Sequence, residues 1–345
     1  MGDTLSSLET LEDVAKAVVA PGKGILAADE STGTIEKRLS GIDVPSTEEN
    51  RRAYRDLLFT APGVEEHISG VILFDETLRQ KSADGTPFPE LLASKGTIPG
   101  IKVDKGAKAL AGAPGETVTE GLDGLRDRLA EYRGLGARFA KWRAVLAIGE
   151  GLPSDYCIDA NAHALARYAA LCVEQDLVPI VEPEVLMDGE HTIDVCAEAT
   201  EKTLTRVFEA LALHRVPIPQ ILLKPNMVIS GGSCADQADA SEVARQTVAC
   251  FRKTLPDNLP GVVFLSGGQS EAEATRNLNA MNAASEKPPW PLSFSYGRAL
   301  QASALKAWRG KPENVESAQQ TFLTRARLNG AAALGTYASD DDPQA

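Results

Sequence analysis

The regular alternation of two kinds of segment constrains the fold of this chain most strongly. Short apolar runs of strand length recur along the sequence, and segments with apolar residues every three or four positions lie between them. The second pattern is typical of amphipathic helices, as at Leu122, Leu125, Leu129, Tyr132 and Leu135. The apolar runs are Gly24–Asp29, Ile68–Thr77, Ile98–Asp104, Ala137–Leu146, Val178–Leu186, Gln220–Val228, Gly261–Gly268 and Leu292–Arg298.

Eight strand-like runs separated by helices predict parallel strands joined by helical crossovers. Eight such units close a (β/α)₈ barrel, which typically takes about 250 residues and often more. We therefore expect an α/β protein with a single TIM-barrel domain over residues 1–345. An open, doubly wound sheet is the alternative, but no G-x-G-x-x-G follows an early strand.

Both ends of the sequence extend this barrel. We expect an N-terminal helix within residues 1–20. A C-terminal helix from about Glu313 is expected to lead into a mobile tail over 335–345, which is acidic and rich in small residues. Two capping-box spacings mark helix starts, Ser6-x-x-Glu9 and Ser46-x-x-Glu49.

Charge and composition exclude several classes of protein. With 35 Lys and Arg against 48 Asp and Glu, the net charge is −13, which disfavours binding to nucleic acid. No apolar run approaches the ~18 residues of a membrane span, and the first 20 residues lack the pattern of a secretory signal. The five cysteines form no C-x-x-C pair, which favours reduced thiols. We expect a cytoplasmic protein without a nucleic-acid or membrane partner.

Charged residues gather at the carboxyl ends of the predicted strands, where barrel enzymes carry their active sites. Residues two apart on a strand face the same side, so three successive strands each present a charged pair on one face. Structural ion pairs would explain a single pair, but this repetition favours catalysis or ligand binding, because burying unpaired ions is costly. The pairs are Lys102/Asp104, Lys141/Arg143 and Glu182/Glu184, and Asp29, Lys224 and Arg298 end other strands.

Lysine chemistry suits this set of residues better than metal chemistry. None of the four histidines lies in an H-x-x-x-H pair or beside a strand-end carboxylate, so we expect no metal and no cofactor. Lys224 stands alone among apolar neighbours, which favours the free amine that attacks a carbonyl, and Lys141 could supply a neighbouring cation. Glu182 could then move protons to and from the iminium.

Two loops have the composition of phosphate sites. Ser266-Gly267-Gly268 follows the seventh run and Ser295-Tyr296-Gly297-Arg298 follows the eighth, and these loops most often bind phosphate in barrels. Glycines expose amide groups to an anion, and arginine adds a forked donor. We expect a second anion site at the opposite side of the mouth, made of Ser31, Thr34, Arg38 and Lys102.

Long motifs at these positions closely resemble class I fructose-bisphosphate aldolases. They run in order over roughly residues 5 to 337. The motifs are GILAADESTG around Asp29, GIKVDKG around Lys102, FAKWR at 139–143, IVEPE at 180–184, LLKPNMV at 222–228, FLSGGQSE at 264–271 and FSYGRALQASALKAW at 294–308.

The resemblance implies a metal-free homotetrameric barrel that splits fructose 1,6-bisphosphate into dihydroxyacetone phosphate and glyceraldehyde 3-phosphate. It matches Lys224 to the Schiff-base lysine, Glu182 to the acid/base and Asp29 to the carboxylate at the C4 hydroxyl. It matches Lys141 and Arg143 to the basic pair beside them, and we expect Glu184, the second carboxylate beside Glu182, to belong to the catalytic set as well. The C1 phosphate would meet Ser266, Gly267, Gly268, Ser295, Gly297 and Arg298, and the C6 end would meet Ser31, Thr34, Arg38 and Lys102.

The chain departs from the better-known animal members at two points. Thr34 stands where they have serine, which keeps the hydroxyl, and the sequence ends in alanine rather than in their catalytic tyrosine. Alternatives to this enzyme are a catalytically silent scaffold barrel, a transaldolase and a zinc-dependent aldolase. The joint presence of Lys224, Glu182 and Asp29 argues against the scaffold, the two phosphate clusters weaken the transaldolase, and the strand-end lysines oppose the zinc enzyme.

Overall fold

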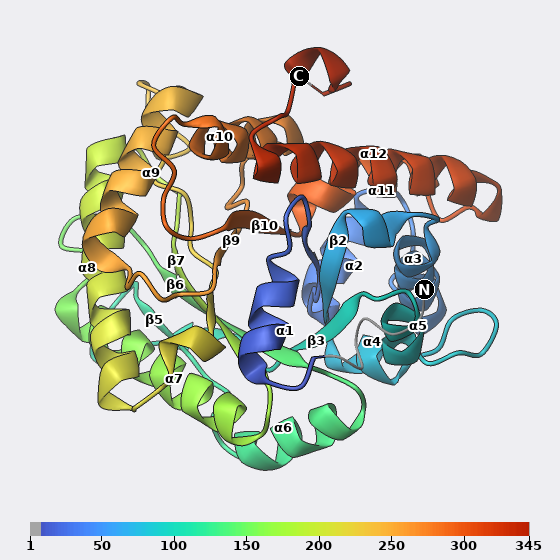
Figure 1. Ribbon diagram of the computed structural model, residues 1–345, viewed down its shortest axis with the longest axis horizontal. Coiled ribbons are helices and arrows are strands. Elements are labelled where there is room, and N and C mark those ends of the chain that lie inside the picture. The colour runs from blue at the N-terminus through green and yellow to red at the C-terminus, as the bar shows by residue number, and fades with distance from the viewer. Residues whose placement is uncertain (1–7, 345) are drawn as a thin grey trace.

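The computed structural model describes residues 8–344, and within them eight parallel strands close into a barrel (Figure 1). Every predicted apolar run contains one of these strands, so the predicted barrel is confirmed. The order around the barrel is β1-β10-β9-β8-β7-β6-β3-β2. The strands are β1 (Gly24–Ala28), β2 (Ile68–Leu73), β3 (Ile98–Lys102), β6 (Phe139–Leu146), β7 (Val178–Val185), β8 (Leu222–Leu223), β9 (Val262–Phe264) and β10 (Leu292–Tyr296).

Helices follow the strands and form the outer layer, with α7, α8 and α9 along one side and α12 across another (Figure 1). None of the helices in this part of the chain is long and apolar enough to cross a membrane. The α-helices are α1 (Leu11–Val18), α2 (Thr32–Ser40), α3 (Glu48–Thr60), α4 (Asp75–Arg79), α5 (Phe88–Ser94), α6 (Leu125–Gly134), α7 (Asp155–Glu174), α8 (Ile193–Leu213), α9 (Ala240–Thr254), α10 (Glu271–Ala283), α11 (Arg298–Trp308) and α12 (Val315–Leu334). Single 3₁₀ turns are η1 (Val64–Glu66), η2 (Ile218–Gln220), η3 (Pro312–Asn314) and η4 (Ser339–Asp341).

The core has two parts, one inside the barrel and one between barrel and helices. Inside, apolar side chains of the strands pack against α1, which closes the barrel at the end where the strands begin (Figure 1). Phe139 fills the centre, and a Cβ on Gly100 would lie 2.1 Å from its ring, so only glycine fits there. The larger part joins the outer faces of the strands to the helices. The open end of the barrel is thus the carboxyl end.

Two helix starts differ from the sequence prediction. Helix α1 begins at Leu11, where Thr10 and Asp13 form the capping box, while Ser6 lies outside the described residues. Helix α3 is capped by Thr47, which accepts a hydrogen bond from the Asn50 backbone, rather than by Ser46. Neighbouring hydroxyl residues offer alternative caps, and the local backbone decides between them.

The structure also contains a small element that the sequence analysis did not predict. Strands β4 (Ala107–Ala109) and β5 (Thr117–Thr119) form an antiparallel hairpin after β3. The Thr119 hydroxyl donates to the Arg143 carbonyl of β6 at 2.7 Å, so the hairpin is tied to the barrel mouth. Strands of three residues give too short a periodic signal to be read from a sequence.

The segment after α12, expected to be a mobile tail, is docked in the structure. The Tyr337 backbone donates to Asn279 of α10 at 3.0 Å. Asp342 forms two hydrogen bonds of 2.7 and 2.8 Å with Arg325 of α12, and both side chains are almost fully buried. The Tyr337 hydroxyl donates to the same carboxylate at 2.9 Å. An acidic tail would be solvated in isolation, but here a buried arginine supplies its partner.

Candidate active site

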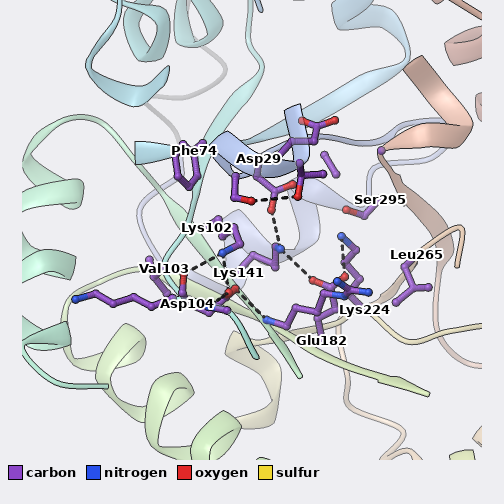
Figure 2. Close-up of a pocket in the computed structure, with 18 of the residues that line it drawn as sticks. Asp29, Phe74, Lys102, Val103, Asp104, Lys141, Glu182, Lys224, Leu265 and Ser295 are labelled. Carbon is purple, nitrogen blue, oxygen red and sulfur yellow. Dashed lines mark hydrogen bonds and ion pairs between the residues drawn. The ribbon is translucent and has the colours of Figure 1, made fainter. Parts of the chain in front are cut away.

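The carboxyl ends of the strands surround a cavity of about 1080 Å³ (Figure 2). Every site residue predicted from the sequence lines this cavity except Gly268. Gly268 belongs to the adjacent wall, since a Cβ built on it would lie 3.7 Å from Arg298 Nη2. The fold therefore brings together residues that are spread over more than two thirds of the sequence.

A continuous row of ion pairs crosses the floor of the cavity. Lys141 Nζ lies 2.6 Å from Asp29 Oδ2 and 3.3 Å from Glu182 Oε2. Glu182 Oε1 lies 3.2 Å from Lys224 Nζ. Figure 2 shows Lys141 between Asp29 and Glu182, with Lys224 and Ser295 to one side. All four charged side chains in the row are at most 11% exposed.

Strand register explains why these charges meet. Lys102 of β3 lies beside Lys141 of β6, and Arg143 lies beside Glu182 of β7. Lys224 directly follows the last residue of β8, and its backbone donates to Val181 of β7 at 2.8 Å. Because alternate residues of a barrel strand point inward, the charged members of each strand enter one space. Trp142, between Lys141 and Arg143, points outward and packs on Tyr168 of α7.

The row fixes the charge of its members. Burial alone raises the pKa of Asp29, but the positive charges of Lys141 and Lys224 outweigh burial and hold that pKa well below its ordinary value. Burial lowers the pKa of Lys141, and the carboxylates of Asp29 and Glu182 outweigh it and raise the pKa. Asp29 is therefore a carboxylate and Lys141 an ammonium at neutral pH. Such a carboxylate can accept a hydrogen bond from a nearby hydroxyl.

Two further ion pairs flank the row. Lys102 Nζ lies 2.6 Å from Asp104 Oδ1 and also donates to the Asp104 carbonyl at 2.9 Å. Arg143 Nε lies 2.5 Å from Glu184 Oε2. Burial lowers the pKa of Arg143 and Glu184 raises it by more, so the net change is upward. The Arg143 side chain is 44% exposed, so it stands at the rim of the cavity rather than on its floor.

The loops after β9 and β10 form the wall of the cavity at which the sequence predicts the first anion site. Gly267 and Gly268 have φ values of +49° and +84°, which let their backbone turn toward the cavity. Ser295 Oγ is buried and has no hydrogen-bond partner in the described part of the chain. Arg298 opens α11 directly after Gly297, and within residues 8–344 it has no ion-pair partner. These groups leave polar atoms free for an anionic ligand.

Helix α2 forms another wall of the cavity, at which the sequence predicts the second anion site. The hydroxyls of Ser31 and Thr34 lie 3.1 Å apart at its start. Arg38 Nε is 3.6 Å from Glu30 Oε1, a separation too long for a hydrogen bond. Lys102 reaches the same region from β3. The two walls suit a ligand with an anionic group at each end.

Several residues that line the cavity were not predicted. Lys37 precedes Arg38 on α2, and Arg128 and Tyr132 come from α6. Arg128 donates to the carbonyls of Val103 and Gly121 and thereby holds the loop after β3. The pattern of charges at strand ends does not reveal these residues, because a side chain on a helix lines the mouth of the barrel only if its helix packs there. Lys37 had a signal in the sequence, since it adjoins a predicted residue on the same short helix.

The donor set of the cavity is carboxylates paired with lysines and arginines. Among the described residues, no group of three or more His, Cys, Asp and Glu side chains is arranged to hold a metal ion. Each carboxylate on the cavity floor already faces an ammonium group at 3.3 Å or less.

Comparison with known proteins gives a consistent result. Residues 10–345 match the family model of glycolytic class I fructose-bisphosphate aldolase. A probable class 1 fructose-bisphosphate aldolase of Xanthomonas campestris is 60% identical over 96% of this chain and 99% of its own length. The cytosolic fructose-bisphosphate aldolase 6 of Arabidopsis thaliana is 59% identical over 93% of this chain and 89% of its own length.

The fold comparison agrees with the sequence comparisons. The fructose-bisphosphate aldolase of Plasmodium falciparum, solved in complex with TRAP and a small-molecule inhibitor, superposes with a TM-score of 0.94. It is 52% identical, and the match covers 95% of each chain. The resemblance noted in the sequence is confirmed, and the chain belongs to the class I fructose-bisphosphate aldolase family.

Proposed function

We propose that Lys224 forms the Schiff base through which this class I aldolase cleaves fructose 1,6-bisphosphate into dihydroxyacetone phosphate and glyceraldehyde 3-phosphate. The row of ion pairs from Asp29 through Lys141 and Glu182 to Lys224 carries this proposal. Two carboxylates and two lysines alternate along this buried line, which supports assigning Lys224 as the nucleophile and the carboxylates as proton carriers. The four charges compensate one another, which offsets much of the cost of burying them.

The proposed reaction begins at Lys224. Lys224 first passes a proton to Glu182, 3.2 Å away. The free amine attacks the C2 carbonyl, a proton moves from nitrogen to oxygen, and the carbinolamine loses water with the proton that Glu182 gives back. The resulting iminium withdraws electrons from the C3–C4 bond. Asp29 takes the proton of the C4 hydroxyl, C3–C4 breaks, and its electron pair enters the enamine. The aldehyde leaves, and the proton held by Asp29 passes through Lys141 to Glu182. Glu182 then protonates C3, and hydrolysis of the resulting iminium frees the second product and Lys224.

The charged neighbours support these steps. Lys141 keeps Asp29 ionised and stays an ammonium that can stabilise negative oxygen as it develops. Arg143 and Glu184 form a pair at the rim that borders the reacting centre. The C1 phosphate binds at Ser266, Gly267, Gly268, Ser295, Gly297 and Arg298. The C6 phosphate binds at Ser31, Thr34, Arg38 and Lys102.

Borohydride trapping tests the assignment of Lys224. Wild type incubated with substrate and reduced should gain one covalent adduct, and peptide mass spectrometry should place it on Lys224. Lys224→Ala should gain none, whereas Lys102→Ala should still be trapped, because that lysine serves phosphate binding. An adduct on Lys141 or Lys102 in the wild type would overturn the assignment.

Metal independence is a separate part of the proposal. The iminium supplies the electron withdrawal that a metal would otherwise supply, so cleavage should continue at full rate in EDTA. Activity that falls in EDTA and returns with zinc would contradict this.

We also propose that the chain works as one barrel domain, as a homotetramer, in the cytoplasm. Family membership supports the assembly, and the names of Arabidopsis relatives that are called cytosolic support the location. Light scattering tests the assembly, since four chains of 36.6 kDa give 4 × 36.6 = 146.4 kDa.

A further inference from the structure

Glu30 lies between two arginines at the edge of the cavity. It directly follows Asp29, and its side chain is 5% exposed. Arg55 of α3 donates from Nη2 to Glu30 Oε2 at 2.6 Å, and its own side chain is 3% exposed. Arg38, on the opposite side, reaches only 3.6 Å from Glu30 Oε1 and is 21% exposed. The carboxylate of Glu30 is therefore hydrogen-bonded to the buried Arg55 and only attracts the partly exposed Arg38.

The pair of Glu30 and Arg55 is incomplete as it stands. Glu30 Oε1 and Arg55 Nη1 are both buried, and neither has a hydrogen-bond partner among the described residues. An arginine and a carboxylate usually form two parallel hydrogen bonds, and leaving such buried atoms unpaired is costly. The neighbouring Arg51 does not compete for Glu30, because both of its bonds to a carboxylate go to Glu76.

We propose that Arg55 is a positioning residue that sets how well the enzyme binds the C6 phosphate. Arg55 holds Glu30 in place, so that Arg38 stays free to bind phosphate. When the Arg38 side chain moves toward the substrate, Arg55 donates hydrogen bonds to both carboxylate oxygens of Glu30. This inference rests on the proposed role of Arg38 at the C6 end. It accounts for the one oxygen of Glu30 and the one N–H of Arg55 that have no partner among the described residues, since the two can bond to each other once Arg38 has moved.

The surroundings make Arg55 a rigid support. Its guanidinium lies 5.6 Å from the centre of the Tyr54 ring. The Tyr54 hydroxyl donates to Gln301 Oε1 at 3.1 Å, and Gln301 Nε2 donates to the Ala27 carbonyl at 2.8 Å. Helix α3 is thereby tied to β1 two residues before Asp29 and to α11, the helix that begins with Arg298. Without Arg55, the Glu30 carboxylate would pair with Arg38 and compete with the C6 phosphate for that side chain.

A comparison of two substrates tests the proposal. Fructose 1-phosphate offers the same ketone and C1 phosphate but no C6 phosphate, so the ratio of its kcat/KM to that of fructose 1,6-bisphosphate isolates the C6 contribution. Arg55→Met should raise KM for the bisphosphate about fivefold and leave kcat/KM for fructose 1-phosphate within about twofold. Equal losses with both substrates would show that Arg55 is only structural, and unchanged kinetics would also overturn the proposal.

Matched variants separate the possible causes. Arg55→Lys keeps the charge and should recover part of the loss. Arg55→Met with Glu30→Gln removes the competing carboxylate and should bring the preference for the bisphosphate back at least to the wild-type value, so failure of this rescue would overturn the mechanism. If Arg55→Met does not fold, Glu30→Gln alone still tests the competition, since it should lower KM for the bisphosphate only.

The role of Arg38 is checked independently. Arg38→Ala should lower kcat/KM for the bisphosphate at least about tenfold more than for fructose 1-phosphate. If Arg38→Ala does not discriminate, the proposed C6 site fails. If Arg38→Ala discriminates but Arg55→Met does not, the C6 site stands and the role of Arg55 is refuted.

Discussion

Lys141 balances the negative charges on the floor of the cavity. It contacts carboxylates on two sides, and each of those carboxylates is 11% exposed or less. Removing one member of such a group leaves its partner as a buried, unpaired charge. The same ammonium therefore stabilises the fold and sets the ionisation of the proposed base Asp29.

The pKa of Asp29 predicts a contribution to acid stability. Its native pKa is lowered from 3.8, so above that value its ion pair stabilises the fold, and the stabilisation is lost as the pH falls toward the lower native pKa. Between about pH 5 and pH 3, this group alone should remove about 1 kcal/mol from the free energy of unfolding. Urea unfolding of wild type and Asp29→Asn at both pH values measures the contribution.

Groups other than Asp29 contribute equally to the unfolding free energy of wild type and Asp29→Asn, so their contributions cancel in the difference between the two proteins. Asp29→Asn is less stable throughout, because Lys141 loses a partner, but the difference in unfolding free energy should shrink by about 1 kcal/mol as the pH falls. A difference that stays constant over this range would mean that Asp29 has an ordinary pKa in the native protein.

At the scale of elements, the strands were predictable and the supporting contacts were not. An apolar run such as Val178–Leu186 predicts a buried strand without any knowledge of its neighbours. The position of Lys224 and Glu182 in the cavity could be predicted, because charged residues are rare in such apolar runs. Arg55 and Arg128 could not, since each sits in a helix among other polar residues and gains its role from a tertiary contact. The sequence prediction placed the helix caps at Ser6 and Ser46 rather than at Thr10 and Thr47, because neighbouring hydroxyl residues offer alternative caps and the local backbone decides between them.

The turn after β9 depends on Gly268. Its φ of +84° is unfavourable for other residues, and a Cβ would lie 2.7 Å from Met187 Sδ. We expect Gly268→Ala to displace the loop that carries Ser266 and to cost about 1.4 kcal/mol of phosphate binding, a tenfold rise in KM. Steady-state cleavage of fructose 1,6-bisphosphate measures the effect. Gly134→Ala is the matched control, because open space surrounds that glycine at the end of α6 and KM should not change. An equal KM in Gly268→Ala and wild type would contradict the prediction that this loop binds the phosphate.

At the scale of the whole molecule, the two ends of the described chain play different structural parts. Helix α1 closes the barrel at the end opposite the cavity, and its apolar side chains complete the interior core. The residues after α12 pack against α10 and α12 (Figure 1). None of the described residues that line the cavity lies beyond Arg298 in the sequence. The docked segment therefore contributes to the packing of the outer helices rather than to the cavity wall.

This placement predicts that shortening the chain affects stability more than cleavage. A variant that ends at Gly335 leaves Arg325 buried without its Asp342 partner, which should cost about 3 kcal/mol of unfolding free energy. Adding Arg325→Met to the shortened variant removes the stranded charge and should recover part of that loss. Urea unfolding of the three proteins measures both effects.

Cleavage by the shortened variant should remain within about tenfold of wild type, well short of the ~10²–10⁴-fold that a general acid or base supplies. Burial and the bond to Asp342 raise the pKa of Tyr337 to about 12, so its hydroxyl stays protonated and engaged with that carboxylate at neutral pH. Tyr337→Phe should then cost about 1 kcal/mol of stability and leave kcat unchanged. Steady-state cleavage and proton exchange on dihydroxyacetone phosphate should be measured for both variants. A loss beyond tenfold in the shortened protein, reproduced by Tyr337→Phe alone, would mean that the tyrosine leaves its docked position and takes part in proton transfer.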